Sequence, residues 1–179
     1  GIGGPNVSNV YVAGGMGHIR RCAGAGPCNM LTSPVSTTLS AVWGTDVNSV
    51  YIVGLSGVVV RCNSVGTCAQ LTSSTSNALQ AVWGSDANNV YVAGISGTIR
   101  RCSNSLGTCA VLTSGTTASL RGIWGPDANN VYVIGDSGTI VRCATGSNTC
   151  TPMQSGTTQN LQGIWGSDAN NVLVVGDAG

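Results

Sequence analysis

The sequence of 179 residues contains no lysine, glutamate or phenylalanine, and only one histidine, His18. Its charges come from seven arginines and six aspartates, so charged residues make up 7% of the chain and the formal net charge is +1. Binding to nucleic acid or to an anionic membrane surface needs a concentrated basic patch, which this composition does not supply. We therefore expect no nucleic-acid partner.

Long apolar runs are also absent. The longest are four to five residues and are broken by glycine, serine and asparagine, so no segment is long enough to cross a bilayer. The N-terminus lacks the basic and apolar regions of a secretion signal, which indicates a mature or excised chain. Few strong helix formers and many glycine, valine, serine and threonine residues predict an all-β fold with almost no helix.

Eight cysteines stand in four close pairs: Cys22 with Cys28, Cys62 with Cys68, Cys102 with Cys109, and Cys143 with Cys150. Close, even pairing predicts local disulfides, and therefore a secreted or cell-surface protein in an oxidising space. Eight cysteines permit many pairings, and zinc is the competing interpretation. Each pair would then need two further ligands, with His18 the only histidine. We expect no metal and no cofactor.

The chain repeats, and tryptophan marks the repeat: Trp43, Trp83, Trp124 and Trp165 are spaced by 40, 41 and 41 residues. This period is typical of propeller blades. Short strands are expected at 39–44, 49–54, 58–62 and 69–73, joined by connections rich in glycine, serine and asparagine. The pattern predicts a single propeller, or a propeller segment, of about 4.5 blades: 1–38, 39–78, 79–119, 120–160 and a half-blade at 161–179.

The second strand of each repeat is apolar on both faces, as in "VYVIG" at 131–135. Such a strand is buried on both faces, as in a sheet that lies between two neighbouring sheets. A β-solenoid also stacks repeats, but its rungs do not reverse direction. The short cysteine spacing brings two sulfurs together most simply across a reversal. We therefore predict four-stranded antiparallel blades of 40–41 residues, with one disulfide across each hairpin of third and fourth strands.

The stretch "WGSDANNVYVAGISGTIRRC" at 83–102 resembles secreted bacterial β-propeller repeats of the BNR/YCF48-like type, especially versions common in myxobacteria. The resemblance extends over nearly the whole chain. It implies a bladed fold with a role in adhesion, sugar binding or assembly. The Asp-box of sialidases, S-x-D-x-G-x-x-W, is absent at Asp86, so the resemblance does not extend to a glycosidase.

Three repeated residue types need an interpretation, and the first two have two each. The tryptophans fill the wedge between blades, or they contact a ligand. The aspartates Asp46, Asp86, Asp127 and Asp168, each followed two residues later by asparagine, shape turns or would bind calcium, for which one carboxylate per turn is few. The arginines before the cysteines predict structural charge pairs that set register: Asp46 with Arg61, Asp86 with Arg101, and Asp127 with Arg142.

The ends of the chain do not match. Five copies carry the first two strands if 1–15 is a worn first copy, with Gly3 in place of tryptophan and Asn6 in place of aspartate, but only four carry the last two. The segment 161–166 is expected either to replace the worn start beside 8–14, or to belong to a half-blade. Such a half-blade continues into a longer chain or pairs by its edge with another molecule.

The leading hypothesis is a non-catalytic secreted module for binding or adhesion, which recognises a glycan or a protein through repeated loops. These loops are "TSPVSTT" (32–38), "TSSTSNA" (72–78), "TSGTTAS" (113–119) and "QSGTTQN" (154–160), with the four tryptophans behind them. The alternative is a structural subunit of a filament or coat, a homo-oligomer formed through the half-blade. The third hypothesis is a glycosidase-like enzyme. It is placed last because the residues that break the repeat, His18, Arg121 and Asp136, form no recognisable catalytic constellation.

Overall fold

The computed structural model describes residues 1–24 and 26–178, and therefore the whole predicted half-blade 161–179 except its last residue. The first sheet holds β1 (Ile2–Asn6), β2 (Asn9–Ala13), β3 (Ile19–Cys22) and β4 (Cys28–Leu31). The second holds β5 (Leu39–Asp46), β6 (Ser49–Gly54), β7 (Val59–Cys62) and β8 (Cys68–Leu71). The third holds β9 (Leu79–Asp86), β10 (Asn89–Gly94), β11 (Ile99–Cys102) and β12 (Cys109–Leu112).

The fourth sheet holds β13 (Leu120–Asp127), β14 (Asn130–Gly135), β15 (Ile140–Cys143) and β16 (Thr151–Met153), and the last has only β17 (Leu161–Asp168) and β18 (Asn171–Gly176). Three single 3₁₀ turns, η1 (Gly15–Gly17), η2 (Leu55–Gly57) and η3 (Asp136–Gly138), are the helical elements of the described chain. Consecutive strands pair antiparallel in every sheet. We call the sheets blades one to five, the fifth being a half-blade.

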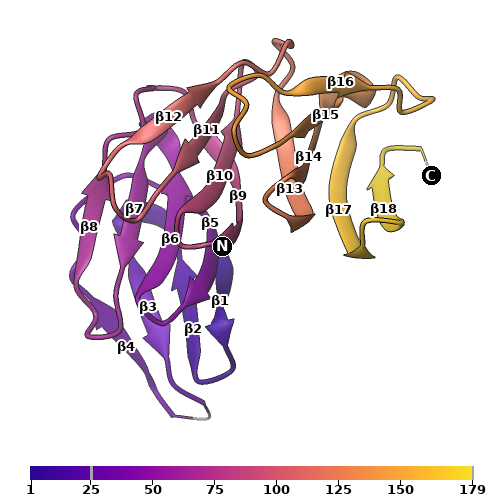
Figure 1. The fold of residues 1–179 in the computed structure, drawn as a ribbon. Coiled ribbons are helices and arrows are strands. Elements are labelled where there is room, and N and C mark those ends of the chain that lie inside the picture. The colour runs from indigo at the N-terminus through magenta and orange to yellow at the C-terminus, as the bar shows by residue number, and fades with distance from the viewer. Residues whose placement is uncertain (25, 179) are drawn as a thin grey trace.

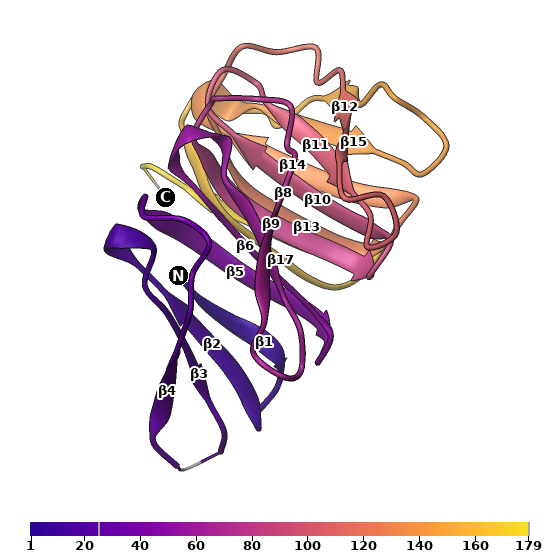
Figure 2. The same ribbon diagram turned by 90° about the vertical axis from the view of Figure 1, so that its left-hand side faces the viewer.

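The blades follow one another in sequence order, with the first strand of each blade beside the first strand of the next. Figure 1 shows the progression from the indigo blade at the N-terminus to the yellow half-blade, and Figure 2 shows β5, β9, β13 and β17 in succession. This is the arrangement of a β-propeller, as the repeat predicted. The predicted first strand, 39–44, extends two residues further, because Asp46 pairs with Ser49 across the turn.

The core lies between the blades. Blades one and two share Tyr11, Ile19, Val42, Ile52 and Val60; blades two and three share Tyr51, Val53, Val59, Val82 and Val92; blades three and four share Tyr91, Ile99, Ile123, Val133 and Val141. The strand Ser49–Gly54 is buried along its whole length. The two apolar faces of the second strand therefore belong to two different interfaces, which confirms the interpretation of its pattern.

Each tyrosine at these interfaces also bonds to the following blade. The Tyr51 hydroxyl donates to the Ala87 carbonyl at 3.0 Å, and the Tyr91 hydroxyl to the Ala128 carbonyl at 3.2 Å. A hydroxyl buried without a partner would cost free energy, so these bonds let a large amphipathic ring fill the interface.

The hairpin turns between the second and third strands are tight. In blade two, Ser56 and Gly57 both have positive φ, 56° and 69°, and the Val58 amide donates to the Leu55 carbonyl at 3.2 Å. This is the type I′ geometry that suits the twist of a two-residue hairpin. Glycine is required at the second position, because a Cβ on Gly57 would lie 2.0 Å from the carbonyl oxygen of Thr75.

The four predicted disulfides are formed, one across each hairpin of third and fourth strands, with Cα atoms 4.0–4.3 Å apart. The pair Cys102–Cys109 is buried, whereas Cys28 of blade one is exposed. Four such bonds are consistent with an extracellular protein. Among the described residues, no helix has the length and apolar character needed to cross a membrane.

The predicted charge pairs Asp46–Arg61, Asp86–Arg101 and Asp127–Arg142 do not form ion pairs. In residues 1–24 and 26–178 the one ion pair is Arg121 with Asp136. The carboxylates are already held by their own turns, as in the bond from the Asn48 amide to Asp46 at 2.7 Å. Arg61 instead reaches the next blade, where its Nη1 donates to the Asn104 carbonyl at 3.2 Å.

The two ends of the chain differ from the internal blades in different ways. The worn first copy is a complete blade, since β1 pairs with β2; the alternative in which 161–166 takes its place beside 8–14 is wrong. A Cβ on Gly3 would lie 2.3 Å from the Val42 carbonyl oxygen, so the position that lost tryptophan lies directly against the next strand. The half-blade packs against β13 and β14 on one side only.

Candidate functional site: the loop face

One end of blades one to four gathers two kinds of connection, the hairpin turn between second and third strands and the connecting loop that leads to the next blade. We call this end of the molecule the loop face. The two are joined through their backbones: the Leu55 amide donates to the Thr38 carbonyl at 3.0 Å and the Ile95 amide to the Ala78 carbonyl at 3.0 Å. A bond from the Gly97 amide to the Ala118 carbonyl, at 2.9 Å, ties the same turn to the loop that follows. The loop face is therefore a cross-linked frame.

A shallow hollow recurs on this face in blades two, three and four. The hollow of blade two, about 510 Å³, is lined by Ser56, Gly57, Gln70, Leu71, Thr72, Ser73, Ser74 and Thr75. That of blade three, about 710 Å³, is lined by Ser96, Gly97, Val111, Leu112, Thr113, Ser114, Gly115, Thr116 and Thr117. That of blade four, about 510 Å³, is lined by Gln154, Ser155, Gly156, Thr157 and Thr158. Equivalent loops thus present equivalent rows of hydroxyl groups.

The second residue of each connecting loop is a serine that shapes the hollow. The Ser73 hydroxyl donates to the Thr75 carbonyl at 3.3 Å, Ser114 to Thr116 at 3.2 Å, and Ser155 to Thr157 at 3.0 Å. A serine that bonds to its own loop in this way replaces a backbone turn. The sequence placed the candidate contacts in these loops, and the structure brings the loops of successive blades to one face.

The hollow of blade two has a cation beside it. Arg100, on β11 of the next blade, donates from Nε to the Ser73 carbonyl at 3.1 Å and from Nη2 to the Ser74 carbonyl at 3.2 Å. Partial burial lowers the pKa of Arg100. The guanidinium therefore joins two blades, because it lies on blade three and donates hydrogen bonds to two carbonyl groups of the loop that follows blade two.

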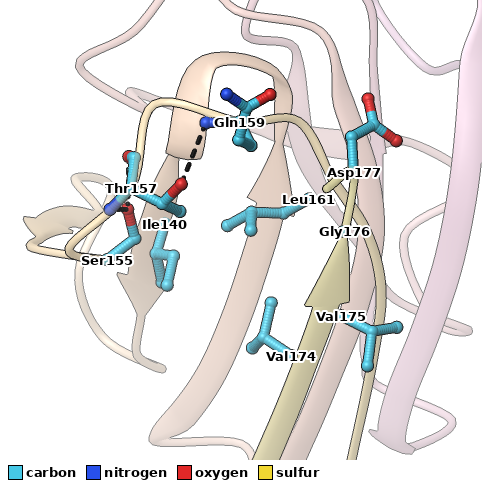
Figure 3. Close-up of a pocket in the computed structure, with 9 residues that line it drawn as sticks. All are labelled: Ile140, Ser155, Thr157, Gln159, Leu161, Val174, Val175, Gly176 and Asp177. Atoms are coloured by element: carbon cyan, nitrogen blue, oxygen red, sulfur yellow. Dashed lines mark hydrogen bonds between the residues drawn. The ribbon is translucent and has the colours of Figure 1, made fainter. Parts of the chain in front are cut away.

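A different kind of cavity lies at the end of this row, between blade four and the half-blade (Figure 3). It measures about 400 Å³ and is lined by Ile140, Ser155, Thr157, Gln159, Leu161, Val174, Val175, Gly176 and Asp177. In a complete blade, the third strand occupies the space beside the second, as Ile140 pairs with Ile134. Beside β18 the described chain has no third strand, so an apolar hollow remains. It shares Ser155 and Thr157 with the hollow of blade four.

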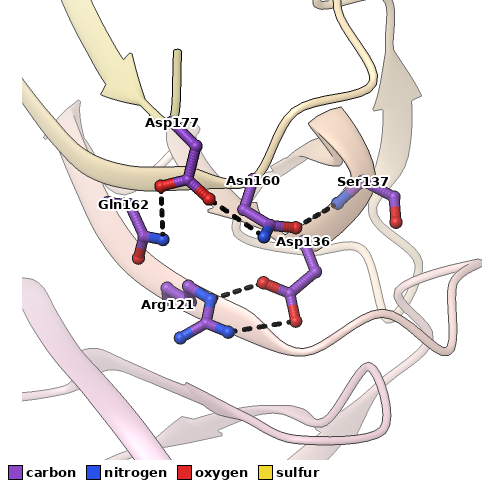
Figure 4. A network of polar contacts seen from close by, with 6 residues as sticks. All are labelled: Arg121, Asp136, Ser137, Asn160, Gln162 and Asp177. Atoms are coloured by element: carbon purple, nitrogen blue, oxygen red, sulfur yellow. Dashed lines mark hydrogen bonds and ion pairs between the residues drawn. The ribbon is translucent and has the colours of Figure 1, made fainter.

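A charged cluster lies on the same face, near the start of β13 (Figure 4). The Arg121 guanidinium donates from Nε and Nη2 to the two carboxylate oxygens of Asp136. This bond, more than the weaker charge effects, raises the pKa of Arg121. Asp177 is held separately, since it accepts bonds from Asn160 and Gln162, both at 3.1 Å.

Sequence reasoning missed this cluster. Blades two and three carry Ser40 and Gln80 at the Arg121 position and Leu55 and Ile95 at the Asp136 position, whereas the half-blade carries Gln162 and Asp177 there. The signal was available: among blades two to five, blade four alone combines the arginine with the aspartate, and the register that pairs Leu120 with Gly135 places the two residues at the same end of the hairpin. His18, the third deviating residue, lies in the hairpin turn of blade one, away from this pair. Among the described residues, no three His, Cys, Asp or Glu side chains gather as a metal site.

The tryptophans lie between blades. The rings of Trp43 and Trp83 are 6.2 Å apart, and each packs against the core of the interface with the next blade. A Cβ on Gly125 would lie 3.1 Å from Cη2 of Trp83, so that glycine forms a seat for the ring of the preceding blade. The linings of the four hollows contain no tryptophan. Trp165 alone is mostly exposed, at 62%.

The aspartates shape the turns at the opposite end of the blades. Oδ1 of Asp46, Asp86, Asp127 and Asp168 accepts a bond from the backbone amide two residues later, at 2.7–2.8 Å. Side-chain donation by Asn130, together with the Asn129 amide, lowers the pKa of Asp127. These carboxylates therefore have local partners at the end of the molecule remote from the hollows.

Comparison with known proteins supports the fold. No family model matches the chain, and no curated protein does. Among solved structures, the chain is similar to YCF48 bound to D1 peptide, with a TM-score of 0.72 and 12% identity over 99% of this chain. The match covers 61% of the YCF48 chain, so this chain spans about three fifths of that length. At this identity the likeness shows the β-propeller fold alone.

Proposed function

We propose that this chain is a non-catalytic extracellular module that binds proteins through its loop face. The observation that carries the proposal is the row of equivalent hydroxyl-lined hollows in blades two, three and four. Equivalent sites in a row suit an extended polypeptide, because several weak contacts made together give avidity without a deep pocket.

A protein ligand is favoured over a glycan by where the aromatic groups lie. Small-ligand sites combine apolar or aromatic walls with a few polar groups. Here the hollows of the row are lined mainly by serine, threonine and glycine, and the tryptophans pack between blades. The similar propeller YCF48 bound to D1 peptide supports the choice of a peptide segment as the ligand.

A non-catalytic role is favoured by the chemistry of the deviating residues. Catalysis needs an acid, a base or a nucleophile with capacity free for substrate. Arg121 and Asp136 satisfy each other, and Asp177 accepts from two amides. We assign to this cluster a role in the specificity of binding. Its two carboxylates and one guanidinium leave a net negative charge, which would favour some ligands over others.

The test is selection of peptides from a phage-displayed random library on the purified chain, with a glycan array in parallel. We expect selected peptides to lose at least about tenfold in affinity when Thr117→Arg or Thr158→Arg fills a hollow, a change of about 1.4 kcal/mol. Both threonines are exposed, so the fold is retained. Val65→Arg, in the cysteine loop at the opposite end of blade two, is the matched control.

Two results would overturn the proposal. Peptides whose affinity is the same for Thr117→Arg, Thr158→Arg and Val65→Arg would show that the loop face is not the site. Strong binding on the glycan array without peptide enrichment would replace the protein ligand with a sugar.

A further inference from the structure

A small cavity lies on the outer strands of blade two, which has a neighbouring blade on each side. It measures about 140 Å³ and is lined by Arg61, Asn63, Thr67, Ala69 and Leu71. Strands β7 and β8 pair Arg61 with Ala69. Just beyond the strands, the Asn63 amide donates to the Thr67 carbonyl at 3.0 Å. Because side chains alternate between the faces of a strand, these residues share the face that Leu71 packs against blade three.

Arg61 is held in place and still has donors for a ligand. Its Nε donates to the Asn48 carbonyl at 3.4 Å and its Nη1 to the Asn104 carbonyl of blade three at 3.2 Å. A guanidinium has five N–H donors, so both hydrogens of Nη2 and one of Nη1 remain. In residues 1–24 and 26–178 these hydrogens have no partner, and the expected ion pair with Asp46 is not formed. The lining of the cavity therefore includes a fixed cation with unused donors.

A departure from the repeat explains why Nη2 of this arginine is free. In blade one, Nη2 of Arg21 donates to Oδ1 of Asn9. In blade four, Nη2 of Arg142 donates to Oδ1 of Asn130. Blade two alone has a serine at the position of these asparagines, Ser49, and its shorter side chain is buried. Without the asparagine acceptor, Nη2 of the blade-two arginine is left for another partner.

Two uncharged donors lie beside the guanidinium. Oδ1 of Asn63 accepts from the backbone amides of Val65 at 3.2 Å and Thr67 at 2.9 Å, so its Nδ2 group points away from the cysteine loop. Among the described residues, neither Nδ2 of Asn63 nor the hydroxyl of Thr67 has a hydrogen-bond partner. Blades one and four have alanine at the position of Asn63, and blade three has serine. The combination of arginine, amide and hydroxyl therefore belongs to blade two.

The chemistry of the lining selects the class of ligand. Among the described residues the lining holds one cation, two uncharged donors and no carboxylate. Guanidinium groups recognise carboxylate, phosphate and sulfate through charge-assisted hydrogen bonds. Leu71 and Ala69 add an apolar wall, which favours a carboxylate on an aliphatic stem because a sulfate or phosphate ion has no apolar surface to bury. One water needs about 10–15 Å³, so the cavity has room for such a group.

We propose that this cavity binds the carboxylate of a short aliphatic acid, either a free acid or an acidic side chain of a partner protein. Arg61, Asn63 and Thr67 donate to the carboxylate oxygens, and the stem lies against Leu71. The cavity shares only Leu71 with the hollow of blade two. The site therefore goes beyond binding at the loop face and does not depend on it.

The test is titration of the chain with propionate at constant ionic strength, followed by NMR of the backbone and side-chain amides. We expect saturable binding with a dissociation constant on the order of 1–10 mM, and shifts of the Asn63 side-chain amide and the Thr67 backbone amide. Ser49→Asn is the decisive variant. It gives Nη2 of Arg61 the acceptor present in blades one and four, leaves the net charge unchanged, and should weaken binding at least about tenfold.

Two further variants keep the test valid if Ser49→Asn fails to fold. Asn63→Ala introduces the residue of blades one and four and should weaken binding about two- to tenfold, the worth of one hydrogen bond. Arg142→Gln is the matched control, because it removes the arginine of blade four at the same repeat position, whose Nη2 is already bonded. We expect it to leave propionate binding unchanged.

The proposal is wrong if propionate gives no saturable shift below about 100 mM. It is also wrong if sulfate binds as tightly as propionate, since the apolar wall would then select nothing, or if Arg142→Gln weakens binding as much as Ser49→Asn, which would indicate an effect of overall charge. A blocked tripeptide with one central glutamate identifies the source of the carboxylate. Tighter binding than propionate would support a side chain of a partner protein, and weaker binding would support a free acid.

Discussion

Trp43 and Tyr51 of blade two and their equivalents in the half-blade, Trp165 and Leu173, occupy the same repeat positions and meet different surroundings. Around Trp43 and Tyr51, the next blade completes a dry interface; among the described residues, no further blade covers Trp165 and Leu173. Burial in a repeat protein is thus a property of the neighbour more than of the residue, because each repeat buries its faces only against the next one. A residue at these positions should therefore contribute most to stability where its blade has a neighbour on that side.

The largest expected effect is the loss of an internal interface. Tyr51→Ala should lower the free energy of unfolding by about 3–5 kcal/mol, since it opens a cavity and leaves the Ala87 carbonyl without its donor. Leu173→Ala, at the same repeat position, should change it by less than about 0.5 kcal/mol. Urea unfolding followed by tryptophan fluorescence, at a concentration where the chain is monomeric, measures both.

The two variants also test the comparison between an internal blade and the half-blade. Equal losses for Tyr51→Ala and Leu173→Ala would mean that the half-blade face is covered in solution even in the monomer. Tyr51→Phe serves as the control, because it keeps the ring in the interface and removes only one bond, worth about 0.5–1.5 kcal/mol.

The disulfides of the first and third blades should differ in how readily a reductant reaches them. Cys102–Cys109 is buried, whereas Cys28 is exposed, so a mild reductant should open Cys22–Cys28 first. Replacing either pair by alanine should cost about 2 kcal/mol by loop-closure entropy, with a further loss for Cys102–Cys109 from emptied core volume. Alkylation and mass spectrometry at successive times give the order. Simultaneous reduction of all four bonds would indicate that global unfolding, not local access, controls the reaction.

The sequence predicted what repeats and missed what depends on particular contacts. The period, the strand pattern and the cysteine spacings led to the blades and the disulfides, because each is local and occurs several times. The charge pairs failed since opposite charges on adjacent strands were assumed to meet, while Arg61 had a carbonyl of the next blade within reach. The cluster of Arg121 and Asp136 was missed because it needs the register of one hairpin and two departures from the consensus.

The Arg121–Asp136 pair of blade four should contribute little to the stability of the fold. Arg121 and Asp136 are partly exposed, so the pair should contribute at most about 1 kcal/mol, and less at high salt. Arg121→Gln restores the residue of Gln80, and Asp136→Leu that of Leu55; the double variant should unfold within about 0.5 kcal/mol of the unaltered chain. If the pair is kept for recognition, the same double variant should weaken the selected peptides while its urea midpoint is unchanged. A large loss of stability would instead make the pair structural.

The smallest expected effect is the pH dependence that separates the aspartate turns from the asparagine turn of blade one. Asn6 accepts the Ser8 amide at 3.1 Å, so this turn needs no charge. In blade four, donation by Asn130 and the Asn129 amide lowers the pKa of Asp127 in the folded chain. A lowered folded pKa gives stability that is full above the unfolded value, about 3.9, and is lost as the pH falls through the folded pKa. The urea midpoint should therefore fall below about pH 4 in the unaltered chain, and fall less in Asp127→Asn, since an amide has no proton to gain. Asn6→Asp should have the opposite effect: it adds a turn carboxylate to blade one, so the urea midpoint should fall more steeply below about pH 4. An equal fall in all three proteins would mean that the turn carboxylates bind protons alike in the folded and unfolded states.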